Sequence, residues 1–394
     1  MHWIAAGVFL QKGGRVKIPP AWKHFYEVIL RFLLRETSGK KWCIFTVTLA
    51  LGIVLGAALL AFVVDPHYRY REPFFYDTVY YELYATAPHI LQRQEYDLLM
   101  LGTSMTRNFF LENIDKTFQC KSVKLAASGG TMEDLRKFFD LAVEAKGSDL
   151  KRVIFSLDIY PLNKSTGHWR DFDFMYRKDH WEDYRYLFSR QTFSSMIYLI
   201  KRKTSPKRQR IHQADRNRMF ATEYAGKPYG LKAVMQDAIH NERIHHTQTP
   251  YHPEHYQKNL YENLLPVFDQ HPEIQFTVYL PPYHIYTYCQ SEQFGEADDL
   301  IRQRSAVLRE LIRRPNVTLH DFQADRKYVT VHEYFSDVQH FSNVAAQILL
   351  ADLVSGRRRI VTEAQIAENE AELRALIREN MPVYYEHLKQ FKKK

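Results

Sequence analysis

Cysteine is scarce in this 394-residue chain, which contains only Cys43, Cys120 and Cys289. So small and odd a number excludes a fold that is held together by a disulfide framework. A bridge between Cys120 and Cys289 is compatible with a domain outside the cell, but the scarcity favours two free, buried thiols. Stability must then come from an apolar core. With 45% hydrophobic residues, the chain is long enough for one large domain with appendages or for two modest domains.

Charge is absent from one continuous stretch. Residues 42–64, WCIFTVTLALGIVLGAALLAFVV, contain no charged side chain. Because about 20 apolar residues cross the core of a bilayer as a helix, this stretch predicts a transmembrane helix that contacts membrane lipid. The stretch also lacks an Ala-x-Ala cleavage site and follows a long N-terminal segment. Both features favour an uncleaved anchor over a signal peptide.

Acidic residues are few before the apolar stretch. Residues 1–41 contain Glu27 and Glu36 as their only acids, against these basic residues: Lys12, Arg15, Lys17, Lys23, Arg31, Arg35, Lys40 and Lys41. By the positive-inside rule, residues 1–41 are expected in the cytoplasm and residues 65–394 in an extracellular or periplasmic domain. The net charge of +9 therefore does not predict a nucleic-acid partner, because an outward-facing domain has little access to one.

Strand-like and helix-like segments alternate after the apolar stretch. The predicted strands cover residues 96–101, 122–125, 152–157, 274–280 and 316–322. The predicted helices cover residues 87–94, 132–145, 255–269, 298–313, 343–354 and 363–379. This alternation predicts an α/β fold with a flavodoxin-like, five-stranded parallel sheet flanked by helices. In such sheets, ligands bind beyond the carboxyl ends of the strands.

Two short motifs lie at such strand ends. Leu99-Met100-Leu101-Gly102-Thr103-Ser104-Met105-Thr106 closes the first strand with Gly-x-Ser, and Asp337-Val338-Gln339-His340 precedes a predicted helix. A serine nucleophile needs a base, and the base needs an acid to fix its tautomer. The motifs therefore predict a serine hydrolase or acyl-transfer site. Each motif alone is weak, since Gly-x-Ser occurs at many turns and Asp337 could simply cap the helix that follows.

Further blocks match a known family in their order along the chain. The sequence resembles the SGNH (GDSL-like) hydrolases, and most closely their membrane-anchored bacterial branch. The blocks are a single N-terminal span, Asp65-Pro66 after it, the Leu101–Thr106 block, Pro281-Pro282-Tyr283 and the Asp-x-x-His motif. The resemblance covers about residues 60–380. Relatives in that branch modify cell-envelope or exported polysaccharides and teichoic acids, often by ester chemistry.

The resemblance implies a role for each motif residue. Ser104 is the expected nucleophile, His340 the base and Asp337 the residue that orients it. The backbone N–H groups of Ser104 and of Gly129 or Gly130 are expected to form the oxyanion hole. No cofactor and no metal are expected. The expected function is a membrane-anchored, extracytoplasmic esterase or acyltransferase that acts on acyl groups of a cell-envelope or exported polysaccharide.

The chain departs from the family at the third block, where an asparagine normally completes the oxyanion hole. Here the third strand ends in Ser156-Leu157-Asp158. Loss of one oxyanion donor typically costs ~100–1,000-fold in rate. Either Asp158, together with Tyr283, contacts the substrate, or Asn163 or Asn108 replaces the missing amide. The departure also leaves open a non-catalytic SGNH-like protein that binds polymer or partners an integral-membrane acyltransferase.

Residues 165–250 interrupt the alternation and are rich in aromatic, histidine and basic residues. We interpret them as an insertion or lid over the active edge of the sheet that could grip an anionic polymer or lipid surface. A solvated loop is the alternative, above all for the basic run 201–210. His245, His246, His252 and His255 have the spacing of metal ligands, but no cysteine or carboxylate completes a set, so no metal site is predicted.

Overall fold

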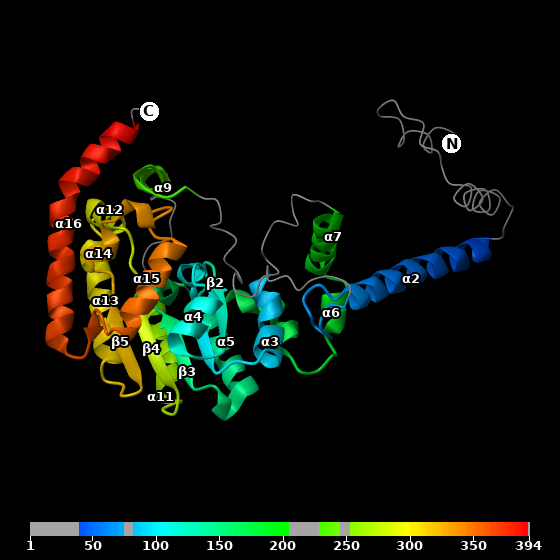
Figure 1. The fold of residues 1–394 in the computed structure, drawn as a ribbon. Coiled ribbons are helices and arrows are strands. Elements are labelled where there is room, and N and C mark those ends of the chain that lie inside the picture. The colour runs from blue at the N-terminus through cyan, green and yellow to red at the C-terminus, as the bar shows by residue number, and fades with distance from the viewer. Residues whose placement is uncertain (1–38, 75–81, 165, 205–227, 245–252, 393–394) are drawn as a thin grey trace. The chain divides into compact units, whose positions relative to one another are not determined.

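The computed structural model describes residues 39–74, 82–164, 166–204, 228–244 and 253–392 (Figure 1). The chain divides into two units, Met1–Leu59 and Leu60–Lys394, each described by itself. The predicted cytoplasmic segment 1–41 lies almost entirely outside the described residues. So do most of the basic run 201–210 and the histidines at 245, 246 and 252.

The apolar stretch forms helix α2, which covers Gly39–Val64 and so begins three residues before the predicted segment. Among the described residues, α2 is the one helix that is long enough and apolar enough to cross a membrane. Its 26 residues span roughly 39 Å, against about 30 Å for the hydrocarbon core of a bilayer. The length and composition are consistent with a single-pass anchor.

The second unit is built on a six-stranded sheet with the order β2-β1-β3-β4-β5-β6. The strands are β1 (Leu98–Thr103), β2 (Ser122–Ala127), β3 (Arg152–Ser156), β4 (Gln275–Leu280), β5 (Val317–Asp321) and β6 (Arg359–Ile360). Strands β1 to β5 pair in parallel in the flavodoxin-like order 2-1-3-4-5. The predicted α/β class is confirmed. The prediction of five strands is wrong, because the short β6 adds an antiparallel edge to β5.

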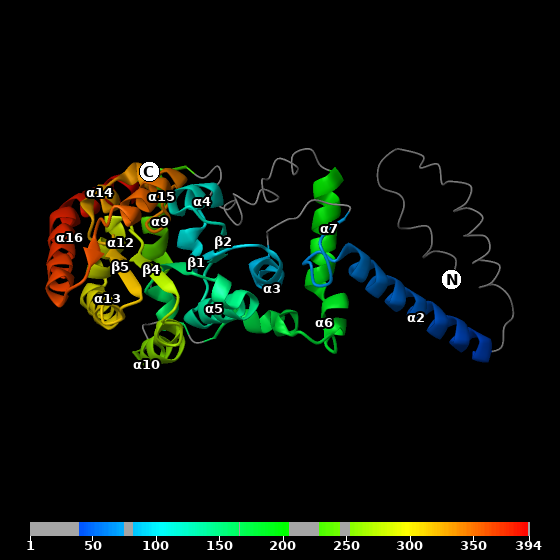
Figure 2. The same ribbon diagram turned by 60° about the horizontal axis from the view of Figure 1, so that its bottom comes forward.

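Helices cover both faces of the sheet, as its buried strands require. All residues of β1 and β2 are buried, which only a sheet covered on both sides allows. Figure 2 shows α4 (Leu111–Phe118) and α15 (Asn343–Val354) on one side, and α5 (Met132–Lys146) and α13 (Ala297–Leu311) on the other.

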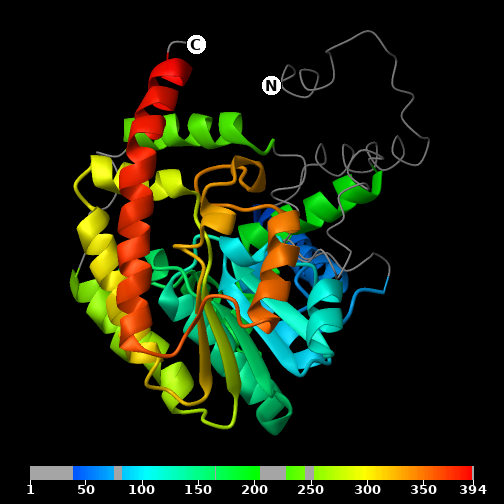
Figure 3. The same ribbon diagram turned by 60° about the vertical axis from the view of Figure 1, so that its left-hand side comes forward.

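The remaining elements complete the unit. They are α3 (Leu83–Arg93), α6 (Asp183–Leu187), α7 (Arg190–Thr204), α9 (Leu231–Ile244), α10 (Pro253–Lys258), the π-helix η9 (Asn259–Leu264), α11 (Leu265–Asp269), α12 (Ile285–Gln293), α14 (Arg326–Val329) and α16 (Glu363–Lys392). Short 3-10 helices are η1 (Ser104–Thr106), η2 (Gly147–Asp149), η3 (Tyr160–Asn163), η4 (His168–Tyr176) and η10 (His332–Tyr334). Figure 3 shows α16, in red, packed beside α12 and α13.

The three cysteines are free. Cys120 is half-buried, Cys289 is buried, and Cys43 is exposed on α2. Of the two alternatives left by the sequence, the unit therefore adopts free thiols rather than a bridge between Cys120 and Cys289.

Candidate active site

Ser104 lies where β1 ends and the chain turns into η1. The turn needs a glycine before it. A Cβ on Gly102 would lie 2.5 Å from Thr106 Cγ2 and 2.7 Å from Ser156 Cβ, closer than packed carbon atoms approach one another. Gly102 therefore lets β1 run close to the end of β3 and places the Ser104 hydroxyl at the carboxyl edge of the sheet.

The structure brings Ser104, His340 and Asp337 together in one hydrogen-bonded series. His340 Nε2 lies 2.8 Å from Ser104 Oγ, although the two residues are 236 positions apart in the chain. On the other side of the ring, His340 Nδ1 lies 2.9 Å from Asp337 Oδ2. The order hydroxyl, imidazole, carboxylate is the one that nucleophilic catalysis by serine requires.

Backbone contacts fix the Asp337 carboxylate in place. The N–H groups of Gln339 and His340 donate to Asp337 Oδ1 at 2.9 and 2.6 Å. Burial raises the pKa of Asp337, but the hydrogen bonds from His340 and Gln339 outweigh it and hold that pKa below its usual value. The ionised carboxylate accepts the Nδ1 proton, so Nε2 carries the lone pair that can take the proton of Ser104.

A cleft of about 300 Å³ opens beside Ser104, and both glycines of the predicted oxyanion hole line it. Gly130 N–H donates to the Ala127 carbonyl at 2.9 Å. Among the described residues, the N–H groups of Ser104 and Gly129 meet no acceptor. The geometry therefore favours Gly129 over Gly130 as the second donor. Gly129 has a φ of +63°, a conformation that favours glycine.

Asp158, which follows β3 by two residues, lies in the wall of this cleft and is buried. Its carboxylate accepts hydrogen bonds from the hydroxyl of Thr103 and, at 2.6 Å, from the hydroxyl of Tyr283. Burial raises the pKa of Asp158, and the bonds from Thr103 and Tyr283 only partly oppose that rise. Asp158 and Tyr283 thus form a hydrogen-bonded pair in the cleft that Ser104 also lines.

Neither asparagine considered as a replacement reaches the cleft. Asn108 Nδ2 donates to the Phe341 carbonyl at 2.5 Å, and Asn163 Nδ2 donates to Gln303 Oε1 at 3.4 Å. Because both amides are engaged away from Ser104, the idea that one of them supplies the missing donor is wrong.

Sequence reasoning missed four residues of the cleft, namely Tyr160, Pro161, Lys164 and Gln339. Lys164 Nζ donates to the Gly129 carbonyl at 2.5 Å, which links the segment after β3 to the loop after β2. Gln339 was inside the Asp-x-x-His motif, so its position beside His340 could have been expected. Tyr160 and Lys164 come from the segment after β3, where no motif marks them.

A second cleft, of about 320 Å³, lies on the His340 side. Its walls carry acidic and amide side chains, which are Asp237, Asn241, Gln290, Glu296, Asp337 and Gln339. Tyr160 and Gln339 line both clefts. Ser104 thus lines the first cleft and His340 lines the second.

Within the described ranges, no three histidine, cysteine, aspartate or glutamate side chains are grouped so that they could hold a metal ion. The class that fold and site define is an α/β protein with a serine, a histidine and an aspartate in series at the carboxyl edge of a mostly parallel sheet. A scan against protein-family models finds no match, and a search of curated proteins finds no significant one.

Proposed function

We propose that this chain is a membrane-anchored, SGNH-type serine esterase or acyltransferase that acts on acyl groups of a cell-envelope or exported polysaccharide, with residues 1–41 in the cytoplasm and residues 65–394 outside it. The observation that carries the proposal is the series Ser104 Oγ, His340 and Asp337, joined at 2.8 and 2.9 Å. The free N–H groups of Ser104 and Gly129 beside it provide the start of an oxyanion hole.

The chemistry follows from the order of these groups. Ser104 Oγ attacks the carbonyl carbon of an ester while its proton passes to His340 Nε2. The N–H groups of Ser104 and Gly129 then stabilise the negative charge on the carbonyl oxygen. His340 returns the proton to the departing alcohol oxygen and leaves an acyl-Ser104. Water, or a hydroxyl of a second polymer, then attacks the acyl carbon while His340 takes its proton. His340 passes that proton to Ser104 Oγ as the bond between Ser104 and the acyl group breaks.

The two clefts suggest where each half of the substrate binds. The departing alcohol must lie near His340, since it receives its proton from there, and the second cleft opens on that side. Carboxylates and carboxamides such as Asp237, Asn241 and Gln290 can hydrogen-bond several hydroxyl groups at once. This lining suits a polyhydroxy alcohol, as a polysaccharide would supply, and the smaller acyl group would occupy the cleft beside Ser104.

The test is labelling of the full chain, in detergent micelles, with a fluorophosphonate probe that reacts with activated serines. Parent protein and Ser355→Ala, an exposed serine outside the site, are expected to label. Ser104→Ala and His340→Ala are expected not to label while unfolding at an unchanged temperature. Labelling that persists in Ser104→Ala would contradict the proposal.

A second function is supported by Asp158. A buried carboxylate stands where the family has an amide donor, which weakens the case for rapid ester cleavage. A non-catalytic protein would use the same clefts to bind polymer or to present it to a membrane acyltransferase. Absence of labelling in a folded parent would favour this alternative, and binding of acylated polysaccharide that is weakened by Asp237→Ala would support it.

A further inference from the structure

A pocket unrelated to Ser104 lies where the chain leaves α2. Its volume is about 640 Å³, and its walls include Phe62 from the last turn of α2 and Arg69, Tyr70 and Arg71 from the residues just after it. The ends of α3 and α5 and the segment 177–180 complete the walls. Since Val64 is the last residue of the apolar helix, the pocket lies a few residues from the membrane-spanning stretch.

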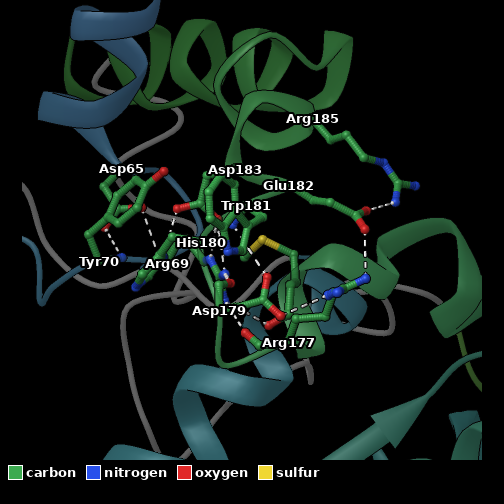
Figure 4. A network of polar contacts seen from close by, with 11 residues as sticks. Asp65, Arg69, Tyr70, Arg177, Asp179, His180, Trp181, Glu182, Asp183 and Arg185 are labelled. Carbon is green, nitrogen blue, oxygen red and sulfur yellow. Dashed lines mark hydrogen bonds and ion pairs between the residues drawn. The ribbon is translucent and has the colours of Figure 1, made fainter.

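Buried hydrogen bonds hold one side of the pocket in shape (Figure 4). The Asp65 carboxylate accepts from the N–H groups of Arg69, Tyr70 and Arg71 at 2.8, 2.8 and 3.1 Å, and from the hydroxyl of Tyr186 at 2.8 Å. Three consecutive backbone N–H groups and one hydroxyl thus donate to the same carboxylate. The segment after α2 is therefore fixed to the domain.

The guanidinium of Arg69 ties the same segment to the opposite wall. Arg69 Nη2 donates to Asp183 Oδ1 at 2.9 Å and to the carbonyl of Asp179 at 2.8 Å (Figure 4). Arg69 Nη1 donates to the carbonyl of Arg177 at 2.9 Å. Residues 177–183 are thus hydrogen-bonded to the segment that follows α2. The walls that these two segments contribute to the pocket are therefore fixed by hydrogen bonds.

The walls of the pocket are strongly basic. They carry five cations, Arg69, Arg71, Arg93, Arg177 and Lys178, but only one carboxylate, Glu144. Three of the cations have carboxylate partners, as in the pairs Arg69–Asp183, Arg177–Glu182 and Lys178–Glu144.

Two of the cations are not neutralised. Arg71 Nη2 donates to the carbonyls of Phe62 and Val63, and Arg93 Nη2 donates to the carbonyl of Tyr70. Among the described residues, neither Arg71 nor Arg93 has a carboxylate partner. The pocket therefore holds two uncompensated positive charges whose remaining N–H groups are available to an anion.

The surroundings point to lipid as the source of that anion. Trp181, Phe74 and Tyr184 are 87%, 68% and 61% exposed, and Trp181 directly follows the wall segment 177–180. Tryptophan and tyrosine concentrate where a membrane meets water. Arginine pairs favourably with phosphate because its planar fork matches two phosphate oxygens.

We propose that this pocket binds the phosphate group of an anionic phospholipid from the leaflet into which α2 leads. Arg71 and Arg93 contact the phosphate, and the exposed aromatic side chains lie among the headgroups. The proposal goes beyond ester chemistry and is independent of it, since no residue of either cleft contributes to the pocket.

The experiment is native mass spectrometry of the full chain, released from micelles containing equal amounts of phosphatidylglycerol and phosphatidylcholine. The parent is expected to retain phosphatidylglycerol preferentially. Arg93→Gln is expected to weaken retention about fivefold, the effect of one basic side chain near an anionic surface, and Arg93→Lys is expected to weaken it less. Arg302→Gln, which removes an exposed arginine from α13, is the matched control and should behave as the parent.

Three results would overturn the proposal. One is equal retention of both lipids by the parent. The second is loss of bound lipid when glycerol 3-phosphate is added at equal concentration, because the pocket would then prefer a soluble phosphate ester to a lipid. Retention that is unaffected by Arg93→Gln, in a variant that unfolds at the parental temperature, would equally exclude this pocket as the lipid site.

Discussion

At the residue scale, the carboxylate of Asp337 both shapes its own turn and sets the tautomer of His340. Oδ1 accepts the backbone N–H groups of Gln339 and His340, and Oδ2 lies 2.9 Å from His340 Nδ1. An asparagine could keep the turn, since its oxygen also accepts. Its NH₂ group, however, would donate to Nδ1 and leave Nε2 protonated, which removes the base.

Asp337→Asn is therefore expected to slow ester hydrolysis and probe labelling by roughly 1,000- to 10,000-fold while leaving the fold intact. The rate of fluorophosphonate labelling of the full chain measures this loss. Thermal unfolding of the same samples is the control. A variant that labels within tenfold of the parent rate would show that His340 does not depend on Asp337.

At Asp158, a substitution is expected to raise the labelling rate rather than lower it. Asp158→Asn introduces the residue type that the SGNH hydrolases, which the sequence resembles, have at the third block. It supplies an amide donor in the cleft and removes a carboxylate whose charge burial disfavours. If the missing amide limits the reaction, probe labelling is expected to rise by about 10- to 100-fold, within the range that one oxyanion donor contributes. Asp158→Ala is the control, because it removes the carboxylate without adding a donor. Equal rates for the two variants would contradict the expectation.

At the scale of elements, a buried lysine links β2 to the loop that follows Ser104 and η1. Lys124 Nζ donates to the carbonyls of Arg107 and Phe109 at 2.8 and 2.6 Å, and thereby holds the chain that follows η1. Burial lowers the pKa of Lys124 to about 7. In the unfolded chain a lysine has a pKa near 10.4.

Between pH 7 and about 10, the unfolded chain then binds more protons than the folded chain at this site, so the free energy of unfolding rises with pH, by at most ~1.4 kcal/mol per unit. Lys124→Met removes this rise and leaves two buried carbonyls unpaired, at ~1–3 kcal/mol each. In urea unfolding at pH 7, 8 and 9, the free energy of unfolding of the parent is expected to rise relative to that of Lys124→Met as the pH increases. Lys121→Met, at an exposed position, should keep the parental slope.

The sequence predicted most elements because their patterns are local. The buried runs of β1 to β5 and the periodicity of α13 and α15 were identified to within a few residues of their observed ends. The single helix predicted over residues 255–269 is instead α10, a π-helical segment and α11. Pro266 cannot donate to the helix, so the ladder changes register before it.

Elements that depend on tertiary contact were missed. Strand β6 has two residues, Arg359 and Ile360, too few for any alternation, and it exists because it pairs with β5. Helix α12 has buried residues on several sides, since α16 and α13 pack against it, so its sequence shows no apolar stripe. The motif residues of the site were predictable from their types and spacing, whereas Lys164 and Asp237 carry no local pattern.

At the scale of the whole molecule, the state of the thiols of Cys120 and Cys289 indicates whether a disulfide bond stabilises the second unit. Burial raises the pKa of both Cys120 and Cys289 to about 12, and the neighbouring Asp115 adds to the effect on Cys120. At pH 8 almost no thiolate is present, and the thiolate is the reactive form.

In a Cys43→Ser background, iodoacetamide at pH 8 is expected to leave Cys120 and Cys289 unmodified in the folded chain and to alkylate both in urea. Dithiothreitol should not change the unfolding temperature. Mass spectrometry of the intact chain counts the alkyl groups. A lower unfolding temperature in dithiothreitol would reveal a bridge between the two cysteines and contradict the free thiols of the structure.

The separation of 236 positions between Ser104 and His340 has a consequence for biosynthesis. A ribosome adds about 5–20 residues per second, so a growing chain carries Ser104 for roughly 10 to 50 s before His340 exists. Throughout that interval the serine has no base and is an ordinary alcohol. In the proposed mechanism the nascent chain therefore cannot cleave esters, and Ser104 gains its base only when about the last seventh of the polypeptide has joined the domain.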